Sequence, residues 1–172
     1  MFKRILVAGA LVAAVVIPSA GVASAAPEAA PQHCVVRVTG QRASGEMTLS
    51  APRCYPTFAK AMSAEGVTAW GEGAAARLAS SGVAGSMTLA IHYDLTGLNP
   101  AGGTTSTVGS GCTGGWLNAS AAWNNRIGST ANGCPNVGHH DGSNLTGDSF
   151  TTTGGGGNLG TMNNRTSSIQ YY

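Results

Sequence analysis

The hexapeptide Asn163-Asn164-Arg165-Thr166-Ser167-Ser168 has a counterpart earlier in the chain, Asn124-Asn125-Arg126-Ile127-Gly128-Ser129. A second pair of matching segments precedes them, since His92-Tyr93-Asp94 and His139-His140-Asp141 each have a leucine four residues beyond the aspartate. Matching segments at equal offsets indicate internal duplication, here of a unit of roughly 40 residues. The sequence therefore predicts two similar halves between residue 87 and the end of the printed chain.

The composition of this duplicated block is typical of an all-β protein. From Met87 onward the chain is rich in Thr, Ser, Gly and Asn, with scattered β-branched and aromatic residues and no sustained helical period. Residues 87–91, 149–151 and 168–172 alternate in polarity, as half-buried strands do. We expect about four short strands in each half, packed as a sandwich of two Greek keys over about residues 85–172.

The two hexapeptides resemble the calcium motif of the microbial βγ-crystallin family, which is an Asn/Asp pair, two free positions, Ser or Thr, and then Ser. Residues 163–168 fit this motif without a mismatch, and residues 124–129 fit it with one departure, at Gly128. His140, Leu145 and Gly147 resemble that family's aromatic hairpin signature in a weakened form. The resemblance covers roughly residues 85–172 and implies a βγ-crystallin-like fold that is calcium-binding and not an enzyme.

The resemblance also implies two calcium sites, each built from one motif and a segment of the other half. Ser167 would supply the hydroxyl of the second site, whereas the first copy has Gly128 at that position and has lost a ligand. Asparagine is neutral, so we expect weak binding, with a Kd of about 10⁻⁴ to 10⁻³ M. The alternative is that both hexapeptides are only turns, because Asn tolerates left-handed backbone. The candidate metal ligands are Asn124, Asn125, Ser129, Asn163, Asn164 and Ser167.

The first 25 residues have the pattern of a signal peptide. Lys3 and Arg4 precede an apolar run over residues 5–17, and the small residues Ala23-Ser24-Ala25 provide a cleavage site. The apolar run is shorter than the roughly 20 residues that a membrane-spanning helix needs. We therefore expect a secreted, extracellular protein with no membrane attachment after cleavage.

A small segment of β and α character, residues 26–70, lies between the signal peptide and the duplicated block. Residues 34–38 and 46–49 are predicted strands, and a short helix is predicted from Thr57 because Phe58, Ala61 and Met62 share one helical face. Residues 71–85 are rich in Gly, Ala and Ser and are predicted to be a linker. The domain proper is then residues 86–172.

The four cysteines predict two disulfide bonds. An even number of cysteines in an exported protein favours disulfides over metal thiolate sites. Four cysteines allow three pairings, and we favour Cys34–Cys54 and Cys112–Cys134, because each pair lies in one compositional block and closes a loop of about 20 residues.

The charges and motifs of the chain exclude several functional classes. Removing Lys3 and Arg4 with the signal peptide reduces nine basic residues to seven, which balance seven acidic ones, so a nucleic-acid binder is not expected. No nucleophile elbow, zinc-protease helix or phosphate loop is present in the sequence. His92, His139 and His140 lie near aspartates and are candidates for acid/base or zinc chemistry, but the same His-x-Asp pattern occurs in both halves, as structural residues would. We expect a monomeric protein without catalytic activity.

A second interpretation is a secreted peptidase inhibitor or toxin-like effector, because the family that the chain resembles includes metalloproteinase-inhibitor and killer-toxin scaffolds. Its partner would be an extracellular protease. The first half contains an insertion, Gly111–Trp116, next to a predicted disulfide. A bridged loop can enter a protease cleft at low entropic cost, but the same segment would equally suit a packed corner.

Overall fold

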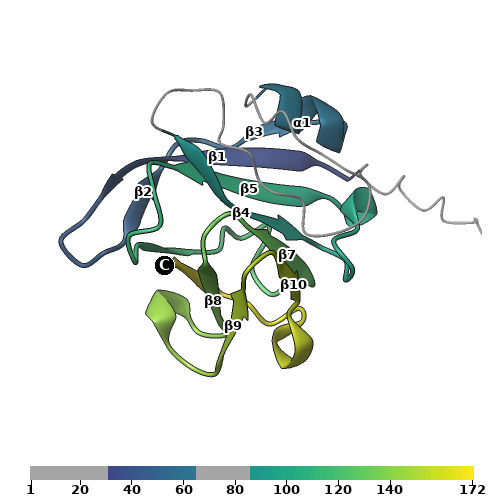
Figure 1. Cartoon of the computed structure of the whole chain (residues 1–172). Helices are drawn as coiled ribbons and strands as arrows, with labels where there is room; N and C mark the ends of the chain where they lie inside the picture. Colours follow the sequence, from purple (N-terminus) through teal and green to yellow (C-terminus); the bar gives the residue numbers. More distant parts are fainter. Residues whose placement is uncertain (1–30, 65–85) are drawn as a thin grey trace, which may run out of the picture.

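The structure is a computed structural model that describes residues 31–64 and 86–172, and it arranges their strands in two β-sheets with one α-helix (Figure 1). The predicted signal peptide and the predicted linker 71–85 lie outside the described residues. The elements are β1 (His33–Gln41), β2 (Met47–Leu49), β3 (Arg53–Tyr55), α1 (Phe58–Ala64), β4 (Met87–Tyr93), β5 (Thr104–Gly109), β6 (Trp116–Asn118), β7 (Ser129–Asn132), β8 (Asn136–His140), β9 (Ser149–Thr153), β10 (Gly156–Asn158) and β11 (Ser168–Tyr171), with short 3₁₀ turns at Pro100–Gly102, Ser143–Leu145 and Gly160–Met162.

The strand order relates the two predicted halves to each other. The larger sheet has the order β10-β7-β4-β5-β1-β2, with β3 also paired to β1, and the smaller sheet has the order β6-β11-β8-β9. The first half, β4 to β7, contributes the neighbouring strands β7, β4 and β5 to the larger sheet. Its remaining strand, β6, belongs to the smaller sheet. The second half, β8 to β11, contributes the neighbouring strands β11, β8 and β9 to the smaller sheet. Its remaining strand, β10, belongs to the larger sheet. The predicted all-β class is confirmed, and the two halves exchange one strand each.

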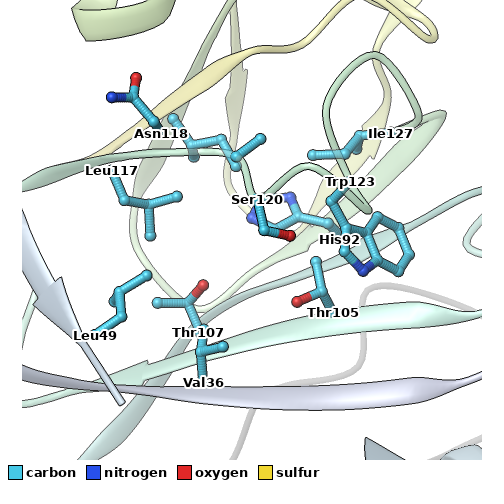
Figure 2. A pocket seen from close by; sticks show the side chains of 12 residues that line it. Val36, Leu49, His92, Thr105, Thr107, Leu117, Asn118, Ser120, Trp123 and Ile127 are labelled. Carbon is cyan, nitrogen blue, oxygen red and sulfur yellow. The ribbon is translucent and has the colours of Figure 1, made fainter. Parts of the chain in front are cut away.

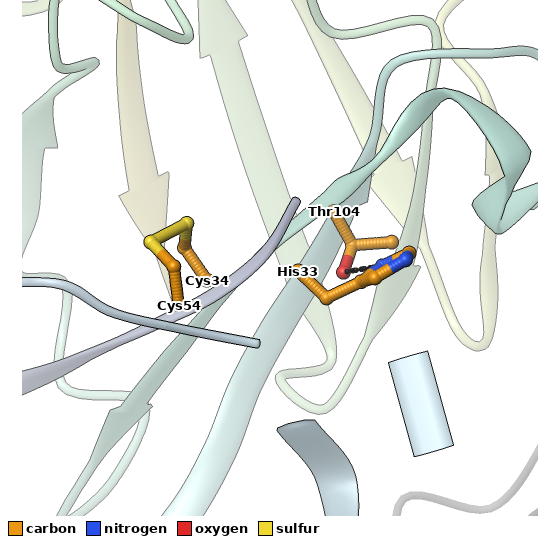
Figure 3. The surroundings of a disulfide bond; sticks show 4 residues. All are labelled: His33, Cys34, Cys54 and Thr104. Atoms are coloured by element: carbon orange, nitrogen blue, oxygen red, sulfur yellow. Dashed lines mark hydrogen bonds between the residues drawn. A yellow bond between two sulfur atoms is a disulfide. The ribbon is translucent and has the colours of Figure 1, made fainter. Parts of the chain in front are cut away.

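The N-terminal segment is part of the larger sheet. Strand β1 runs parallel to β5, with His33 opposite Thr104 and Arg37 opposite Val108. The His33 Nδ1 atom lies 3.2 Å from the Thr104 hydroxyl, within this pairing (Figure 3). β1 pairs with the edge of β5 that faces away from β4. The backbone N–H and C=O groups on that edge are therefore hydrogen-bonded and not left open. The described part of the predicted N-terminal segment 26–70 thus shares a sheet with strands of residues 86–172.

Both predicted disulfides are present. Cys34 and Cys54 face each other on the antiparallel pair β1 and β3, which places their Cα atoms 4.0 Å apart (Figure 3). Cys112 and Cys134 are bonded with their Cα atoms 5.5 Å apart. The first bridge fixes the N-terminal segment at its outermost strand, and the second holds the loop before β6 to the turn before β8.

Helix α1 packs on the face of the larger sheet that points away from the smaller one (Figure 1). Its N-terminus is capped by the Thr57 hydroxyl, which accepts a hydrogen bond of 3.2 Å from the Lys60 N–H. Ala61 and Met62 are buried and contact the cluster that contains Ile91 and Val108. No helix in the described ranges has the length and apolarity needed to cross a bilayer.

The main core lies between the two sheets. It contains buried side chains from both, among them Leu89, Leu117, Val137, Ile169 and Tyr171. Full burial of such an apolar side chain contributes about 1.5–3 kcal/mol to folding. Strand β4 is buried along nearly its whole length because the larger sheet has a core on each face.

Candidate functional site

The two repeated hexapeptides lie side by side and are joined by symmetric backbone hydrogen bonds. We refer to residues 124–129 as the first motif and residues 163–168 as the second motif. The Asn125 N–H donates to the Thr166 carbonyl at 2.9 Å, and the Asn164 N–H donates to the Ile127 carbonyl at 2.9 Å. Each motif is thereby hydrogen-bonded to the motif of the other half.

Asn125 and Asn164 occupy equivalent left-handed backbone positions. Both have a φ of 56°, which few residues other than Gly and Asn adopt readily. Both residues are exposed, as are their neighbours Asn124 and Asn163. The second asparagine of each motif is therefore required by the turn, whatever else its amide does.

Ser129 has a different role from the metal ligand that the sequence suggested. Its side chain is fully buried, and its hydroxyl donates to the Leu95 carbonyl at 2.6 Å and accepts from the Leu98 N–H at 3.0 Å. Ser168, at the same motif position, makes the equivalent two bonds in the second half, to Gly142 and from Leu145. The last serine of each motif closes the hairpin loop of its own half, so its hydroxyl is already committed.

The aspartates of the hairpin loops bind the arginines of the motifs. Arg126 Nη2 lies 3.0 Å from Asp94 Oδ2, and Arg165 Nη2 lies 2.5 Å from Asp141 Oδ2 and 3.0 Å from Asp148 Oδ2. These carboxylates lie beside the motifs, but Asp94 is paired with Arg126, and Asp141 and Asp148 share Arg165. Asp94 and Asp141 are thus ion-pair partners of arginine in this structure, and Asp141 also lies close enough to His140 to oppose the lowering of its pKa by burial.

The oxygen atoms that remain for a cation come from both halves of the chain. The Ser167 hydroxyl donates a long hydrogen bond of 3.4 Å to the amide oxygen of Asn125. Ser167 is 8% exposed, and Asn125 is at the surface beside it. The structure therefore brings Ser167 to the first motif, whereas the resemblance implied that its hydroxyl belongs to the second site with Asn163 and Asn164.

The second motif faces a position without a hydroxyl. The residue of the first half that lies against it is Gly128, and a Cβ atom placed there would be 2.6 Å from the Asp94 carbonyl oxygen and 3.1 Å from the Asn163 amide oxygen. A side chain at this position would overlap the backbone, so Gly128 offers no side-chain oxygen to the second pair of asparagines. The missing hydroxyl of the first motif is therefore missing opposite Asn163 and Asn164, whereas Asn125 has the Ser167 hydroxyl beside it.

Charged ligands are sparse in this region. Within residues 31–64 and 86–172, no group of three or more His, Cys, Asp or Glu side chains is close enough to hold a metal ion. A cation at the first motif would be held by amide, hydroxyl and carbonyl oxygens, which are hard ligands of the kind that Ca²⁺ accepts. Sites with so little ligand charge belong to the weak end of calcium affinities.

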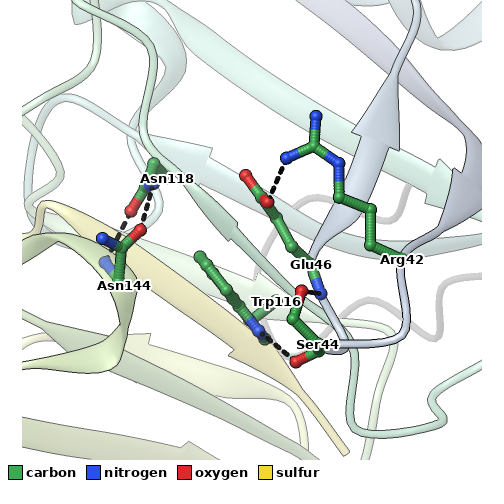
Figure 4. A network of polar contacts seen from close by, with 6 residues as sticks. All are labelled: Arg42, Ser44, Glu46, Trp116, Asn118 and Asn144. Atoms are coloured by element: carbon green, nitrogen blue, oxygen red, sulfur yellow. Dashed lines mark hydrogen bonds and ion pairs between the residues drawn. The ribbon is translucent and has the colours of Figure 1, made fainter.

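The insertion at residues 111–116 forms a packed corner. The Gly114 N–H donates to the Tyr171 carbonyl at 2.8 Å, the Trp116 N–H donates to the Gly45 carbonyl at 3.1 Å, and the Trp116 indole N–H donates to the Ser44 carbonyl at 3.2 Å (Figure 4). Thr113 is the one exposed residue of the insertion, and the others are buried or partly buried. The segment is held on both sides and does not project from the surface.

Strand β6, which follows this corner, is hydrogen-bonded to the second half through the side chain of its last residue. Asn118 donates from its amide to the Asn144 side-chain oxygen at 2.9 Å and accepts from the Asn144 N–H at 2.8 Å (Figure 4). Asn144 has a φ of 58°, so this reciprocal pair stabilises an unusual backbone conformation in the hairpin loop of the second half. Sequence patterns give no sign of such a contact between distant asparagines.

The histidines of the two halves meet in the core. His92 on β4 and His139 on β8 are both fully buried, and their rings are 5.6 Å apart in an edge-to-face arrangement. Burial lowers the pKa of His139 to about 4, and burial together with the proximity of His139 lowers the pKa of His92. Both imidazoles are therefore neutral at pH 7, and neither is open to solvent as an acid or base at the surface would be.

A short polar chain runs from His92 through the core. Its Nε2 atom lies 3.2 Å from the Tyr171 hydroxyl, which donates to the Thr107 hydroxyl at 3.0 Å. The sequence does not predict this series of hydrogen bonds, because its three members come from three strands that are distant in the sequence.

Comparison of the polypeptide sequence and structure with protein-family models, with curated proteins and with solved structures found no match.

Proposed function

We propose that this protein is an exported, non-enzymatic βγ-crystallin-like module that binds Ca²⁺ weakly at its first motif and is stabilised by it. The observation that carries the proposal is the contact between Ser167 and Asn125, in which the Ser167 hydroxyl donates to the Asn125 amide oxygen at 3.4 Å and so brings two candidate oxygen ligands together from opposite halves. A cation held there would connect the halves. Its binding would therefore stabilise the folded state, because the unfolded chain does not bring these oxygens together.

The Greek-key part of the proposal rests on strand order. Each half provides three strands to one sheet and a fourth to the other, which is the arrangement expected of two intertwined Greek keys. The two hairpin loops are closed by serines at the same motif position, Ser129 and Ser168. These equivalences support a duplicated unit with two motif loops, of which only the first has a hydroxyl opposite its asparagines.

Export and the absence of catalysis are parts of the same proposal. Two disulfides suit an oxidising compartment, and the N-terminal sequence has the pattern of a cleaved signal. The inhibitor interpretation needs a projecting loop, and the packing of residues 111–116 does not favour it. The structural calcium module is therefore the function that the geometry supports best.

The test is thermal unfolding in chelator and across a Ca²⁺ titration, with Mg²⁺ as the comparison ion. For a Kd of about 1 mM, mass action gives about 1.4 kcal/mol of added stability at 10 mM Ca²⁺. This corresponds to a rise in Tm of about 5 °C for a domain of this size. A saturable rise with Ca²⁺ and a smaller one with Mg²⁺ are expected.

Matched variants locate the site. Asn125→Gly and Asn164→Gly each remove an exposed amide at a φ of 56°, where glycine is unstrained, so their basal stabilities should be similar. We expect Asn125→Gly and Ser167→Ala to abolish the calcium response and Asn164→Gly to keep it. A response that survives both first-site variants, or that is absent from the unmodified protein at 10 mM Ca²⁺, would refute the proposal.

A further inference from the structure

A pocket of about 210 Å³ lies where strands β1 and β5 separate. The parallel pairing of these strands ends with Arg37 opposite Val108, although β1 continues to Gln41 and β5 to Gly109. The pocket is lined by the ends of both strands, by the loop that follows β5, and by single residues of β2 and β4. It is therefore formed jointly by the N-terminal segment and the duplicated block.

Two irregularities of strand pairing meet at this pocket. Thr39 is an extra residue in the pairing of β1 with β2, and Leu89 is an extra residue in the pairing of β4 with β5. Both residues line the pocket. A β-bulge bends its strand and re-aims a side chain, and bulges are common next to functional sites. Their coincidence here distinguishes the pocket from an ordinary gap in packing.

The lining combines buried apolar residues with exposed polar ones. Leu89 and Met47 form an apolar floor and are 0% and 7% exposed. Gln41, Ser110 and Thr113 also line the pocket and are exposed at its rim. None of the lining residues is Asp, Glu, Lys, Arg or His. The pocket thus offers an apolar surface to C–H groups and polar partners to hydroxyl groups, but no opposite charge to an ion.

Polar groups of the rim are available to a ligand. Among residues 31–64 and 86–172, the hydroxyls of Ser110 and Thr113 have no hydrogen-bond partner. The Gln41 amide nitrogen donates to the Gly45 carbonyl at 3.1 Å, which leaves the Gln41 amide oxygen as an acceptor. A hydroxyl both donates and accepts, so a ligand with several hydroxyls can pair with all three side chains.

A smaller cavity between the two sheets has a different character (Figure 2). Its volume is about 70 Å³, and its lining includes the apolar side chains of Leu117, Trp123 and Ile127. This volume is about half of the ~150 Å³ apolar cavity that admits benzene, whereas the pocket beside β1 exceeds that size. Of the two, only the pocket beside β1 has room for a six-membered ring.

We propose that the pocket beside β1 binds one neutral pyranose sugar. The C–H groups on one face of the ring pack on Leu89 and Met47, and the hydroxyls of the ring pair with Ser110, Thr113 and Gln41. A charged ligand is disfavoured because no lining residue balances its charge. A purely apolar ligand is disfavoured because it would take water from the rim groups and give no hydrogen bond in return. This site is independent of the calcium proposal and shares no residue with either motif.

The test is a ¹H–¹⁵N NMR titration of the full protein with the methyl glycosides of glucose, galactose and mannose. Gly40, Gly109 and Gly111 line the pocket, so their amide signals report binding there. We expect at least one glycoside to shift these signals saturably, with a Kd in the millimolar range that is usual for so small a ligand. The methyl glycoside of the corresponding uronic acid should bind at least about tenfold more weakly, because its carboxylate meets no cation in the lining.

Two substitutions test the role of the rim. Ser110→Ala and Thr113→Val each remove an exposed hydroxyl, and each should weaken sugar binding by about three- to tenfold. Thr153→Val is the matched control, since this exposed threonine lies on β9 in the other sheet, and it should leave the affinity unchanged.

The titration of the unmodified protein decides the proposal even if a variant fails to fold. No saturable shift of the three glycine signals with any of the glycosides would overturn it, as would equal affinity for the uronic acid. Unchanged affinity in both rim variants would also overturn it. Acetyl-trialanine amide serves as a peptide probe, and saturable shifts with this peptide but with none of the sugars would assign the pocket to a polypeptide instead.

Discussion

The buried pair His92 and His139 predicts that the protein loses stability in mild acid. In the native state both imidazoles are fully buried between the sheets, and burial lowers the pKa of each. In the unfolded chain an imidazole has a pKa of about 6.5. Below this pH the unfolded state binds protons that the native state excludes, so stability must fall as the pH falls.

The magnitude follows from the pKa of His139, which is about 4 in the folded protein. Stability changes by about 1.4 kcal/mol per pH unit for each proton between the two pKa values. His139 alone therefore costs about 2 kcal/mol on going from pH 7.5 to pH 5, and about 3 kcal/mol below pH 4. His92 acts in the same direction. For a domain with a total stability of about 5–15 kcal/mol, this is a large fraction.

The assay is urea unfolding followed by tryptophan fluorescence at pH 7.5, 6.5, 5.5 and 5.0. His139→Leu replaces the imidazole with an apolar side chain of similar size that does not titrate. We expect the unmodified protein to lose stability steadily below pH 6.5, and His139→Leu to lose about 2 kcal/mol less by pH 5. His140→Leu is the matched control, since this neighbouring histidine is only partly buried and should leave most of the pH dependence in place.

Two results would refute this reasoning. An unchanged pH dependence in His139→Leu would mean that the buried imidazole is not the group that takes up the proton on unfolding. A stability that rises between pH 6.5 and pH 5 would reverse the sign and mean that the core stabilises the charged ring.

Three further outcomes are expected. Ser129→Ala, which removes both hydrogen bonds that close the first hairpin loop, should lower stability by about 2–3 kcal/mol in denaturant unfolding and leave the calcium response intact; a lost response with normal stability would restore Ser129 as a ligand. Replacing both Cys34 and Cys54 by Ala should lower stability by about 3 kcal/mol, measured against the oxidised protein, because the bridge closes a loop with a sequence separation of 20. Gly128→Ser should destabilise the protein by about 1–3 kcal/mol and add no calcium affinity at the second motif, because its Cβ would overlap the Asp94 carbonyl; tighter calcium binding in isothermal titration would contradict this.

The features that could be predicted from the sequence are local or repeated. The matching offsets of the two motifs predict the duplication, and the strand lists of the two halves agree with it. The spacing of Phe58, Ala61 and Met62 predicts the helix, which spans Phe58–Ala64. The cysteine pairing was also accessible, because each bridge lies within one compositional block.

The features that escaped prediction depend on contacts between distant residues. The parallel pairing of β1 with β5 joins strands that are separated by a long stretch of sequence. No pattern in either strand predicts which strand it will pair with. Ser129 and Ser167 look equally suited to bind a cation, but one hydroxyl is used by a hairpin loop and the other lies against Asn125 of the other half. Tertiary structure decides which hydroxyl is used inside a hairpin loop and which one meets the other motif, so the motif alone does not fix which oxygen atoms lie together.

The position of β11 constrains the order in which the molecule can be made. This strand lies between β6 and β8, so residues 168–171 form an interior strand of the smaller sheet although they are synthesised after all of its other strands. Until they leave the ribosome, β6 has no neighbour in that sheet, and the pair β8 and β9 lacks its inner partner. The smaller sheet must therefore assemble after translation has passed residue 171, and a nascent chain cannot complete either half before the other is available.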